Sequence, residues 1–465
     1  RHQYARIEIF KNHFYIKEYD ENVYEIIYKL KKYAESGIKN YTHSVDLWMK
    51  NSGLIIDCDE KKNALRNLFK NSKVAFIYGA AGTGKSTMIN YISSLFKDKQ
   101  KIFLANTNPA VENLRRKVTA EHAEFVTITK FLSKDVSNDC DILCLDECST
   151  ISNRDMVRVL QRAQCKLLVL VGDIYQIESI LFGNWFNIAY KVMPKDSVAE
   201  LTRPHRTTVQ GLIEVWNKVR EITEDRLEFI TRNGLSSTLD ESIFSRTEED
   251  EIVLCLNYDG IYGINNINKF LQSNNVNPSI NWGVLSYKVG DPVLFNESNR
   301  FAPLVYNNLK GKILQIEEEE DCIYFTIEVY TVLNELDVIG FDLELKESVT
   351  DETSVIRFKV GRGGDGNDDN DNVENVVPFQ VAYAISIHKA QGLEYESVKV
   401  VITSEIEEMV SHNIFYTAIT RAKSKLKIYW SPETEKRILE NMKVQFNDKD
   451  YQLFKAKYKE ALLKS

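Results

Sequence analysis

The sequence lacks any long uninterrupted apolar run. No stretch reaches the roughly 18 apolar residues that a membrane-spanning helix needs. Residues 1–4 form neither the charged block nor the apolar core of a signal peptide. We therefore expect no membrane span and no secretion, and we expect the protein to work inside the cell.

Cysteine is also sparse, with seven residues in 465 and no C-x-x-C pair. An odd number without paired spacing predicts neither a disulfide framework nor a zinc site, so a reducing compartment is expected. Cys140, Cys144 and Cys148 are evenly spaced, but they cross a predicted buried strand, where a thiol behaves as a small apolar side chain. We expect core cysteines rather than metal ligands.

Basic residues do not outnumber acidic residues. The chain has 59 Lys and Arg against 67 Asp and Glu, a net charge of -8. A protein that coats nucleic acid by bulk attraction carries the opposite balance, so any nucleic-acid contact must be local. The 43% hydrophobic and 27% charged residues are typical of a globular protein, and the length predicts roughly three domains.

The first half of the chain alternates between strand and helix patterns. Short apolar runs that each end in a polar or glycine-bearing turn occur at 74–78, 102–105, 142–145 and 167–171. Helical patterns at 86–96 and 109–117 lie between such runs, which predicts an α/β domain over residues 58–200. Residues 1–57 carry Val23, Ile26, Ile27 and Leu30 at helical spacing. We expect a helical segment there, which is either the remainder of a larger domain or a docking element for a protein partner.

The second half repeats the alternation with one interruption. An amphipathic stretch at 209–219 and strand patterns at 252–256, 381–384, 398–402 and 426–430 predict a second α/β domain from residues 201–290 and 378–465. Residues 291–377 instead contain closely spaced β-like runs with no helix between them, which predicts a small inserted β-barrel. Within the insertion, residues 361–375 are acidic and too polar to pack, so we expect a disordered loop.

Residues 79–87 read GAAGTGKST and fit G-x-x-x-x-G-K-[ST] between a strand and a helix pattern. In this arrangement glycines let backbone N–H groups close around phosphate oxygens, and the helix N-terminus adds its positive end. Lys85 then neutralises the β- and γ-phosphates, and Ser86 coordinates magnesium. The predicted nucleotide-binding residues are Gly79, Ala80, Ala81, Gly82, Thr83, Gly84, Lys85, Ser86 and Thr87.

A pair of carboxylates follows about sixty residues later, where DILCLDECS (141–149) places Asp146 and Glu147 at the end of an apolar strand. Two carboxylates at such a position are costly without a cation. In a phosphate-loop ATPase Asp146 holds the magnesium ion together with Ser86, and Glu147 accepts a proton from the attacking water.

Further motifs narrow the class. VGDIYQIESI (171–180), LTRPHRT (201–207), AISIHKAQGLEYESV (384–398) and YTAITRAKSK (416–425) resemble, in order, the third to sixth motifs of superfamily 1 helicases. The style of H-K-A-Q-G and Y-T-A-I-T-R-A is similar to the B branch, which holds RecD-like, Pif-like and Dda-like helicases. The resemblance covers residues 58–432.

This resemblance implies two RecA-like phosphate-loop domains in tandem, with ATP and Mg²⁺ in the cleft and an SH3-like barrel inserted in the second domain. It places Gln176 at the γ-phosphate, and guanidinium groups suit the charge that develops there, which favours Arg206 and Arg421 as catalytic residues. Gly392 and Glu394 match positions near the nucleotide sugar.

The same resemblance predicts a polynucleotide surface from residues at strand ends. Its members are Thr107, Asn108, Thr127, Lys130, Ser386, His388 and Lys389. Hydroxyl, amide and amine donors at strand ends position phosphates without reading sequence. Trp185 either stacks on a base or is a buried core residue.

The chain also departs from the family pattern. No glutamine stands near residues 59–64, where the family reads adenine, which leaves the base preference open. Residues 133–140 are the whole link between the Thr127 motif and the carboxylate strand, where relatives carry a duplex-splitting hairpin. We expect a motor that translocates well and unwinds weakly.

The sequence thus predicts an ATP-driven helicase or translocase on single-stranded DNA, with RNA left open, moving 5′ to 3′ as the resembled branch does. One alternative is a nucleic-acid-stimulated ATPase switch that recruits or remodels a partner without processive unwinding. A second is an interaction module with a decayed ATPase, against which the presence of Lys85, Asp146, Glu147, Gln176 and Arg421 argues. The sequence has no cluster of zinc ligands that would indicate a zinc-dependent nuclease.

Overall fold

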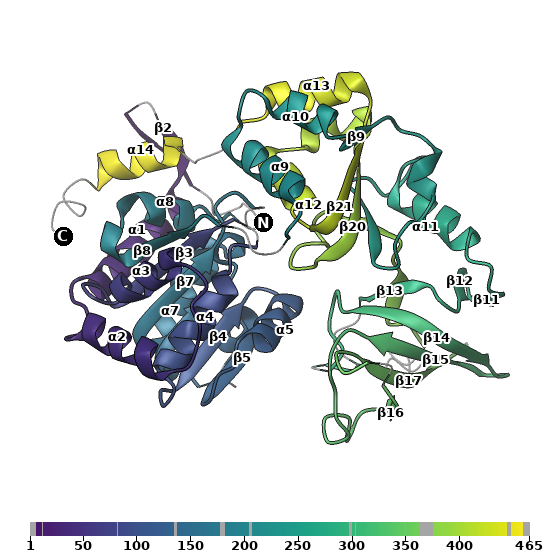
Figure 1. Cartoon of the computed structure of the whole chain (residues 1–465), viewed down its shortest axis with the longest axis horizontal. Coiled ribbons are helices and arrows are strands. Elements are labelled where there is room, and N and C mark those ends of the chain that lie inside the picture. Colours follow the sequence, from purple (N-terminus) through teal and green to yellow (C-terminus); the bar gives the residue numbers. More distant parts are fainter. Residues whose placement is uncertain are drawn as a thin grey trace. The chain divides into compact units, whose positions relative to one another are not determined.

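The computed structural model describes residues 6–11, 13–80, 82–133, 137–176, 182–203, 207–296, 300–302, 304–348, 350–362, 375–443 and 448–458 (Figure 1). The chain forms two compact units. The first holds Arg1–Thr223, Ser411–Thr420 and Met442–Ser465, and the second holds Glu224–Val410 and Arg421–Asn441. In the division expected from sequence, 201–290 and 378–465 formed one domain, whereas parts of both ranges here belong to the first unit.

A parallel six-stranded sheet in the order β5-β4-β6-β7-β3-β8 forms the centre of the first unit. Its strands are β3 (Val74–Gly79), β4 (Lys101–Ala105), β5 (Ala123–Thr127), β6 (Asp139–Leu145), β7 (Gln164–Gly172) and β8 (Val198–Leu201). β3 is apolar along its whole length, and β4 is apolar after Lys101, because both faces of the sheet are covered. The alternating β/α pattern predicted for residues 58–200 is confirmed.

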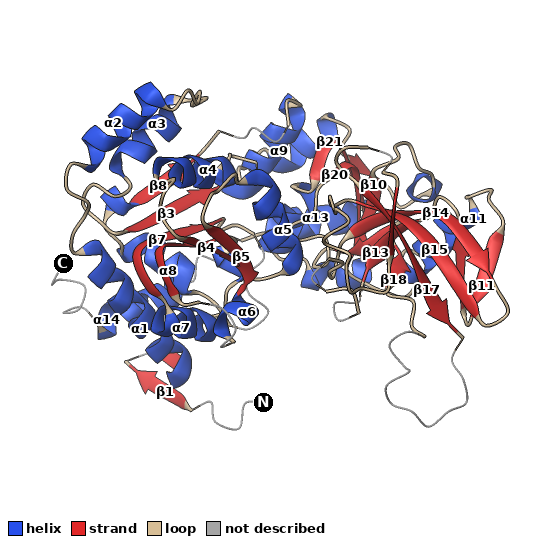
Figure 2. Cartoon of the chain, turned by 90° about the horizontal axis from the view of Figure 1, so that it is seen from below, coloured by secondary structure: helices blue, strands red, loops and turns tan. Residues whose placement is uncertain are grey.

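Helices cover both faces of this sheet (Figure 2). One face packs on α1 (Lys17–Ala34), α7 (Asn153–Arg162), α8 (Trp185–Val192) and α14 (Asp448–Lys457). The other packs on α2 (Tyr41–Asn51), α3 (Asp59–Asn67), α4 (Lys85–Leu95) and α5 (Asn108–Lys117). The unit also contains α6 (Ile128–Leu132), α9 (Gln210–Glu221), α12 (His412–Ile419) and the short turns η1 (Cys148–Thr150) and η2 (Lys195–Ser197).

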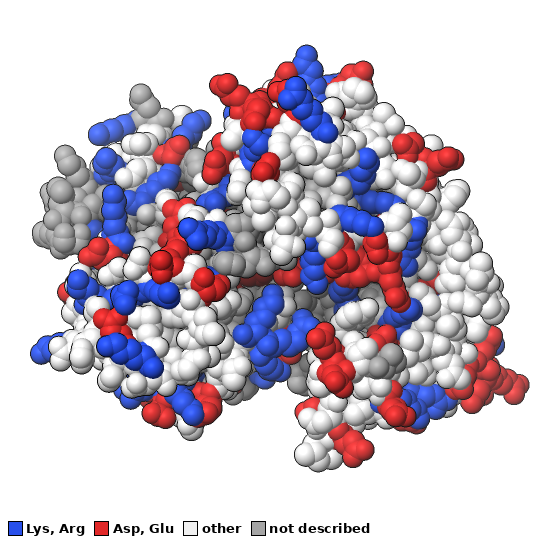
Figure 3. Space-filling model, in the orientation of Figure 1, with Lys and Arg blue, Asp and Glu red and all other residues white. Residues whose placement is uncertain are grey.

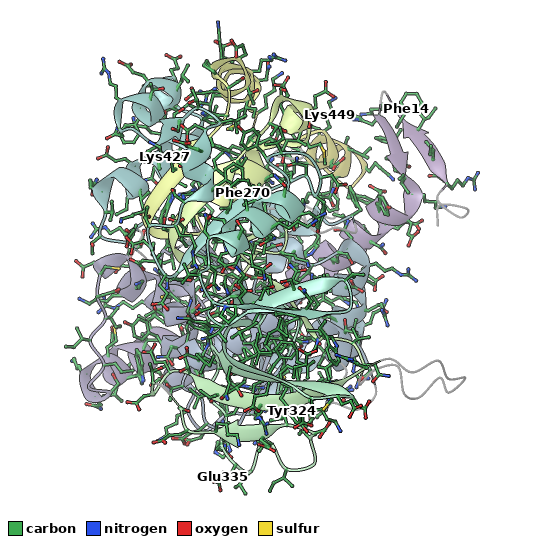
Figure 4. All side chains as sticks on the ribbon, turned by 90° about the vertical axis from the view of Figure 1, so that its right-hand side faces the viewer. Phe14, Phe270, Tyr324, Glu335, Lys427 and Lys449 are labelled. Carbon is green, nitrogen blue, oxygen red and sulfur yellow. The ribbon has the colours of Figure 1, made fainter. Side chains whose placement is uncertain are left out.

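The N-terminal segment is an integral layer of the first unit. Val23, Ile26, Ile27 and Leu30 all lie on α1 and are buried in the core beside the sheet, which confirms the predicted helix. The segment is not purely helical, because an antiparallel hairpin of β1 (Ile7–Phe10) and β2 (His13–Ile16) precedes α1. Phe14 on β2 is exposed (Figure 4).

A parallel five-stranded sheet in the order β19-β10-β20-β21-β9 forms the centre of the second unit. Its strands are β9 (Ser236–Ser237), β10 (Glu251–Cys255), β19 (Ala384–Ser386), β20 (Tyr395–Val401) and β21 (Ala422–Tyr429). The unit's helices and helical turns are α10 (Arg226–Arg232), η3 (Glu241–Phe244), α11 (Ile264–Ser273), η4 (Ser404–Met409) and α13 (Pro432–Asn441). Two parallel sheets thus occur in tandem, as expected for a pair of RecA-like domains.

The second unit also contains an antiparallel six-stranded sheet in the order β16-β17-β15-β14-β13-β18. Its strands are β13 (Pro292–Phe295), β14 (Lys310–Glu318), β15 (Cys322–Val329), β16 (Glu344–Lys346), β17 (Ser354–Gly361) and β18 (Phe379–Val381). A separate hairpin of β11 (Ser279–Trp282) and β12 (Leu285–Lys288) precedes it. Aliphatic and aromatic side chains together form the core of the six-stranded sheet, and Tyr324 on β15 is not among them (Figure 4). The disordered loop expected at 361–375 falls almost entirely outside the described residues.

The chain passes between the two sheets of this unit at a position that the sequence pattern reads as one strand. Val381 pairs with Val293 in the antiparallel sheet, and Ala384 pairs with Val253 in the parallel sheet. The apolar run at 381–384 is therefore the crossing between two strands and not a strand itself. A continuous apolar run predicts burial. Here one end of the run packs in the core of the antiparallel sheet and the other end in the core of the parallel sheet.

Candidate nucleotide site and nucleic-acid surface

The phosphate loop lies between the buried strand β3 and helix α4, as the motif predicts. Gly82 and Gly84 have φ angles of 76° and 85°, in the left-handed region that favours glycine. A Cβ at Gly79 would come within 2.4 Å of the Thr83 hydroxyl oxygen, so only glycine fits there. Ala81 lies outside the described residues. The loop is thus a tight turn whose backbone is free of side-chain bulk at three positions.

The Lys85 side chain folds back into this loop. Its Nζ donates to the carbonyl oxygens of Gly79, at 2.7 Å, and Ala80, at 2.9 Å. The Thr83 hydroxyl donates to the same Ala80 carbonyl at 3.0 Å. Ser86 and Thr87 follow in the first turn of α4, where the helix dipole is positive. The Lys85 ammonium group, the hydroxyl groups of Thr83, Ser86 and Thr87, and a helix N-terminus therefore all come from residues 83–87.

Asp146 and Glu147 leave the carboxyl end of β6, two strands away from β3 in the sheet. Burial raises the pKa of the Asp146 carboxyl, while the Glu147 N–H and the charge of Lys85 lower it. That N–H donates to Asp146 Oδ1 at 2.8 Å. Glu147 itself has a φ of 50°, a strained conformation for a residue with a side chain. The structure brings Lys85 and Asp146 into one electrostatic environment.

Gln176 follows β7, the strand between β6 and β3. Its N–H donates to the Asp173 carbonyl at 3.4 Å, and the Tyr175 N–H donates to Asp173 Oδ1 at 3.0 Å. Asp173 is buried, and its two hydrogen bonds hold the turn at residues 173–176. Gln176 therefore lies at the same carboxyl edge of the sheet as the phosphate loop and Asp146.

Three predicted nucleotide-site residues belong to the second unit. Arg421 is buried there, and its Nη1 donates to the Leu393 carbonyl at 3.2 Å. The Tyr395 N–H in turn donates to the Arg421 carbonyl at 3.0 Å. Gly392 has a φ of 80°, and Glu394 is half-buried beside it. The structure thus joins Arg421 to the segment that carries Gly392 and Glu394, whereas Arg206 lies outside the described residues.

The predicted strand-binding residues of the first unit follow neighbouring strands. Thr107 caps α5 by accepting from the Ala110 N–H, and Thr127 caps α6 by accepting from the Lys130 N–H at 3.2 Å. β4 and β5 pair up to Thr127, so both caps lie at one edge of the sheet. Thr107, Asn108 and Lys130 are exposed. These side chains form an open polar edge.

Three further predicted strand-binding residues follow β19 in the second unit. The Ser386 hydroxyl is buried and accepts from the Lys389 N–H at 3.2 Å, so it holds the turn. The Lys389 ammonium donates to Gln380 Oε1 at 3.0 Å, and burial lowers the pKa of this lysine. His388 is exposed between them. Of the three, His388 is therefore the side chain most accessible to a ligand.

Two charged groups near the nucleotide site were not predicted from the sequence. Lys61 on α3 is buried, and its Nζ donates to Asp57 Oδ2 at 2.6 Å. Lys61 shares a helix face with Leu65, a position at which a lysine signals an unusual environment. Arg220 on α9 pairs with Glu200 at 3.1 Å and lies over the ring of Tyr175, next to Gln176. No local pattern marks Arg220, because its partners come from distant segments.

Trp185 and the cysteines take the structural roles considered for them. Trp185 is fully buried on α8, and its Nε1 donates to the Ile151 carbonyl at 3.0 Å. Cys140, Cys144 and Cys148 are buried free thiols, as expected for core residues. Across the described ranges, no helix is long and apolar enough to cross a membrane, and no group of three or more His, Cys, Asp or Glu could hold a metal ion.

Acidic and basic side chains are interspersed over the face shown in Figure 3. Because neither sign of charge dominates this face and the net charge is -8, we expect nucleic acid to bind through a few local contacts and not through general electrostatic attraction.

Comparisons with known proteins agree with the motif order. The AAA domain family matches residues 58–240, and the UvrD-like helicase C-terminal domain family matches residues 381–429. Similar proteins include RecBCD enzyme subunit RecD of Buchnera aphidicola, 23% identical with 83% of this chain and 78% of that protein covered. ATP-dependent DNA helicase Pif1 of Campylobacter jejuni is also 23% identical, with 76% and 88% covered. These matched families and relatives support a superfamily 1 helicase of the B branch.

The fold comparison concerns the two parallel sheets in tandem. The structure of Bacteroides Pif1 bound to single-stranded DNA matches with a TM-score of 0.50 at 16% identity, covering 88% of this chain and 98% of that one. The likeness supports the tandem RecA-like fold. An uncharacterized protein of Methanocaldococcus jannaschii is 24% identical, and the chain spans only 37% of its length, with 79% of this chain covered.

Proposed function

We propose that the chain hydrolyses ATP at the phosphate loop and uses the energy to move 5′ to 3′ along single-stranded DNA. The observation that carries this proposal is the meeting of Lys85, the first turn of α4 and the partly buried Asp146 carboxylate at one edge of the first sheet. A cation, hydrogen-bond donors and a carboxylate in one place suit a nucleoside triphosphate with its metal ion.

The residues present fit a magnesium ion. Ser86 offers a hydroxyl oxygen in the first turn of α4, and Asp146 offers a partly buried carboxylate whose charge a cation would stabilise. Ser86 and Asp146 are the groups that would hold it. When bound, the ion neutralises charge on the phosphate oxygens.

The remaining residues have distinct roles in the proposed reaction. Glu147 accepts the proton of the attacking water, and Gln176 contacts the γ-phosphate. Arg421 and Arg206 supply guanidinium groups for the charge that develops on the transferred phosphoryl oxygens. Gly392 and Glu394 lie near the sugar. These assignments follow the motif matches.

The strand-binding surface is proposed from both units. Thr107, Asn108, Thr127 and Lys130 contribute from the first unit, and Ser386, His388 and Lys389 contribute from the second. Backbone contacts of this kind position a strand without reading its sequence. DNA is proposed over RNA because a helicase that resembles the chain is named as a DNA helicase. We place the protein with nucleic acid inside the cell.

The test is steady-state ATP hydrolysis with no polynucleotide, with single-stranded DNA and with single-stranded RNA at fixed salt. We expect strong stimulation by DNA. Lys85→Ala should abolish hydrolysis and leave DNA binding measurable, because Lys85 contacts phosphate and not the strand. Retained turnover in this variant contradicts the proposed site. Stimulation by RNA alone contradicts the proposed track.

A second candidate is a DNA-stimulated switch that remodels a partner without processive unwinding. It is favoured by the short link between α6, which ends at Leu132, and β6, which begins at Asp139. Residues 134–136 of this link lie outside the described residues. Displacement of streptavidin from a biotinylated strand end separates the two candidates, because only a translocase performs it. Efficient unwinding of long duplexes contradicts both the switch and the expected weak unwinding.

A further inference from the structure

The side chain of Lys310 connects the inserted antiparallel sheet to the segment around Glu394. Lys310 is the first residue of β14. Its Nζ donates to Asp250 Oδ1 at 2.6 Å and to the Glu394 carbonyl at 3.3 Å. The same ammonium lies 4.1 Å from the ring centroid of Tyr395 and 5.2 Å from that of Tyr330. One side chain from the insertion is therefore held by four groups, two of which belong to residues 394–395.

Asp250 fixes the same segment from a second direction. Its Oδ2 accepts from the Glu396 N–H at 3.1 Å, and its own carbonyl accepts from the Ser397 N–H at 3.1 Å. Asp250 immediately precedes β10, the neighbour of β20 in the parallel sheet. The Lys310–Asp250 pair therefore contacts the chain where β20 begins, at residues 394–397.

Residues 393–395 of this segment are also hydrogen-bonded to Arg421. The Tyr395 N–H donates to the Arg421 carbonyl at 3.0 Å, and the Arg421 guanidinium donates to the Leu393 carbonyl at 3.2 Å. Both the main chain and the side chain of Arg421 are therefore hydrogen-bonded to residues 393–395. A shift of this segment would move the guanidinium group directly.

Lys310 and its neighbour Lys312 on the same strand have different environments. Burial lowers the pKa of the Lys310 ammonium, while the charge of Asp250 opposes that shift. A cavity of about 100 Å³ lies beside it, lined in part by Asp250, Tyr330 and Tyr395. Lys312, two residues along the same strand, makes a simple ion pair with Glu249 nearer the surface. A partly buried ammonium is costly to desolvate, and here Asp250, the Glu394 carbonyl and two tyrosine rings compensate for that cost.

We propose that Lys310 is a positioning residue, which orients Arg421 for ATP hydrolysis through the 393–396 segment and so makes turnover depend on the inserted sheet. The inference rests on the proposed function, in which Arg421 acts on the phosphates. Its physical basis is that a small displacement of a charge-stabilising group slows phosphoryl transfer far more than it weakens nucleotide binding.

The experiment compares Lys310→Met, Lys310→Arg and the control Lys312→Met. Met keeps the length of the lysine stem and removes the charge, and Arg keeps the charge and can lie over the two tyrosine rings. ATP turnover at saturating DNA gives kcat and KM, and hydrogen–deuterium exchange reports on the peptide that contains residues 393–397. Thermal unfolding is measured for each variant.

We expect Lys310→Met to lower kcat by about tenfold or more. Its KM should stay within about twofold of the original, because Lys310 is not placed at the nucleotide. Exchange at 393–397 should rise. Lys310→Arg should recover most of the kcat, and Lys312→Met should match the unaltered chain in all three readouts.

Several results overturn the proposal. These are an unchanged kcat in Lys310→Met, a kcat loss that Lys310→Arg does not restore, or an equal loss in Lys312→Met. A fall in kcat that accompanies only a lower thermal midpoint, with unchanged exchange at 393–397, also overturns it. If the unaltered chain hydrolyses no ATP, the proposed function fails, and the exchange comparison still decides whether Lys310 holds the segment.

Discussion

The ammonium group of Lys61 lies directly behind Gly84 of the phosphate loop. A Cβ built on Gly84 would come within 2.6 Å of Lys61 Nζ, and Gly84 has a φ of 85°. The lysine is buried and hydrogen-bonded to Asp57, so it has little room to withdraw. The loop is therefore confined on the side of α3 by a cation.

This contact predicts that Gly84→Ala weakens ATP binding. The methyl group meets Lys61, and the left-handed backbone costs a non-glycine residue about 1–2 kcal/mol. We expect the Kd for a fluorescent ATP analogue to rise by about tenfold or more, since 1.4 kcal/mol is a factor of ten. Gly53→Ala is the matched control: Gly53 has a φ of 67°, but nothing lies within 4 Å of an added Cβ. Equal losses of affinity in both variants would contradict the steric argument.

Glu147→Gln tests the assignment of the general base. Gln keeps the size of the side chain and cannot accept the proton of the attacking water. We expect kcat for ATP hydrolysis to fall by about 10²–10⁴-fold. Nucleotide affinity, measured by equilibrium titration, should stay close to that of the unaltered chain. Glu124→Gln on the exposed side of β5 is the control, and a similar kcat in the two variants would refute the role of Glu147.

Arg421→Lys tests the need for a guanidinium group. Lysine keeps the positive charge and loses the planar fork that contacts the Leu393 carbonyl and suits phosphoryl oxygens. We expect DNA-stimulated turnover to fall by about 10³-fold, in the range seen for arginine fingers. Arg437→Lys is the control, because Arg437 is exposed and pairs with Glu407 at 2.5 Å. Turnover that survives Arg421→Lys would remove Arg421 from the catalytic set.

The phosphate loop could be predicted from the sequence because strand, turn and helix are adjacent in the chain. The glycines, Lys85 and the first turn of α4 are fixed by local geometry, and the structure places them as the motif implies. The strands at 102–105 and 142–145 were predictable for a related reason: strands buried on both faces are continuously apolar.

Features that depend on distant partners were not predictable. The Lys310 contact with Glu394 joins residues 84 positions apart, and no periodicity marks it. The apolar run at 381–384 predicts burial but cannot reveal that Val381 and Ala384 join different sheets. The edge strand β5 buries only Val126 and has no strong pattern. Local sequence specifies which side chains are buried more readily than it specifies their partners.

Leu30→Ala tests whether the N-terminal helix is part of the first unit's core. Leu30 is fully buried on α1 and packs in the cluster beside the sheet. We expect the free energy of unfolding to fall by about 2–5 kcal/mol, the usual loss for a buried leucine. Chemical denaturation measures it. Tyr28→Ala is the control, because Tyr28 is 47% exposed on the same helix. A loss as small as that of the control would mean that α1 is a separate module.

Asp450 provides a test of how α14 is attached to the first unit. The Asn184 side-chain amide donates to Asp450 Oδ2 at 2.8 Å. Burial raises the pKa of the Asp450 carboxyl above its usual 3.8, an effect to which Asp20 adds and which Asn184 opposes. The carboxyl therefore binds a proton more tightly in the folded state than in the unfolded state. This difference matters between the usual pKa of 3.8 and the raised pKa of the folded state. The free energy of unfolding must fall as the pH rises through that window.

Asp450→Asn removes this pH dependence and keeps an oxygen that accepts from Asn184. We expect the variant to gain stability relative to the unaltered chain as the pH rises from about 4 to about 7, with the difference greatest at the upper end. Thermal midpoints across that range measure it. Asp448→Asn is the control, because Asp448 is 72% exposed and pairs with Lys191 at the surface. A variant that loses stability at neutral pH would show that the ionised carboxylate, and not the neutral acid, holds α14 in place.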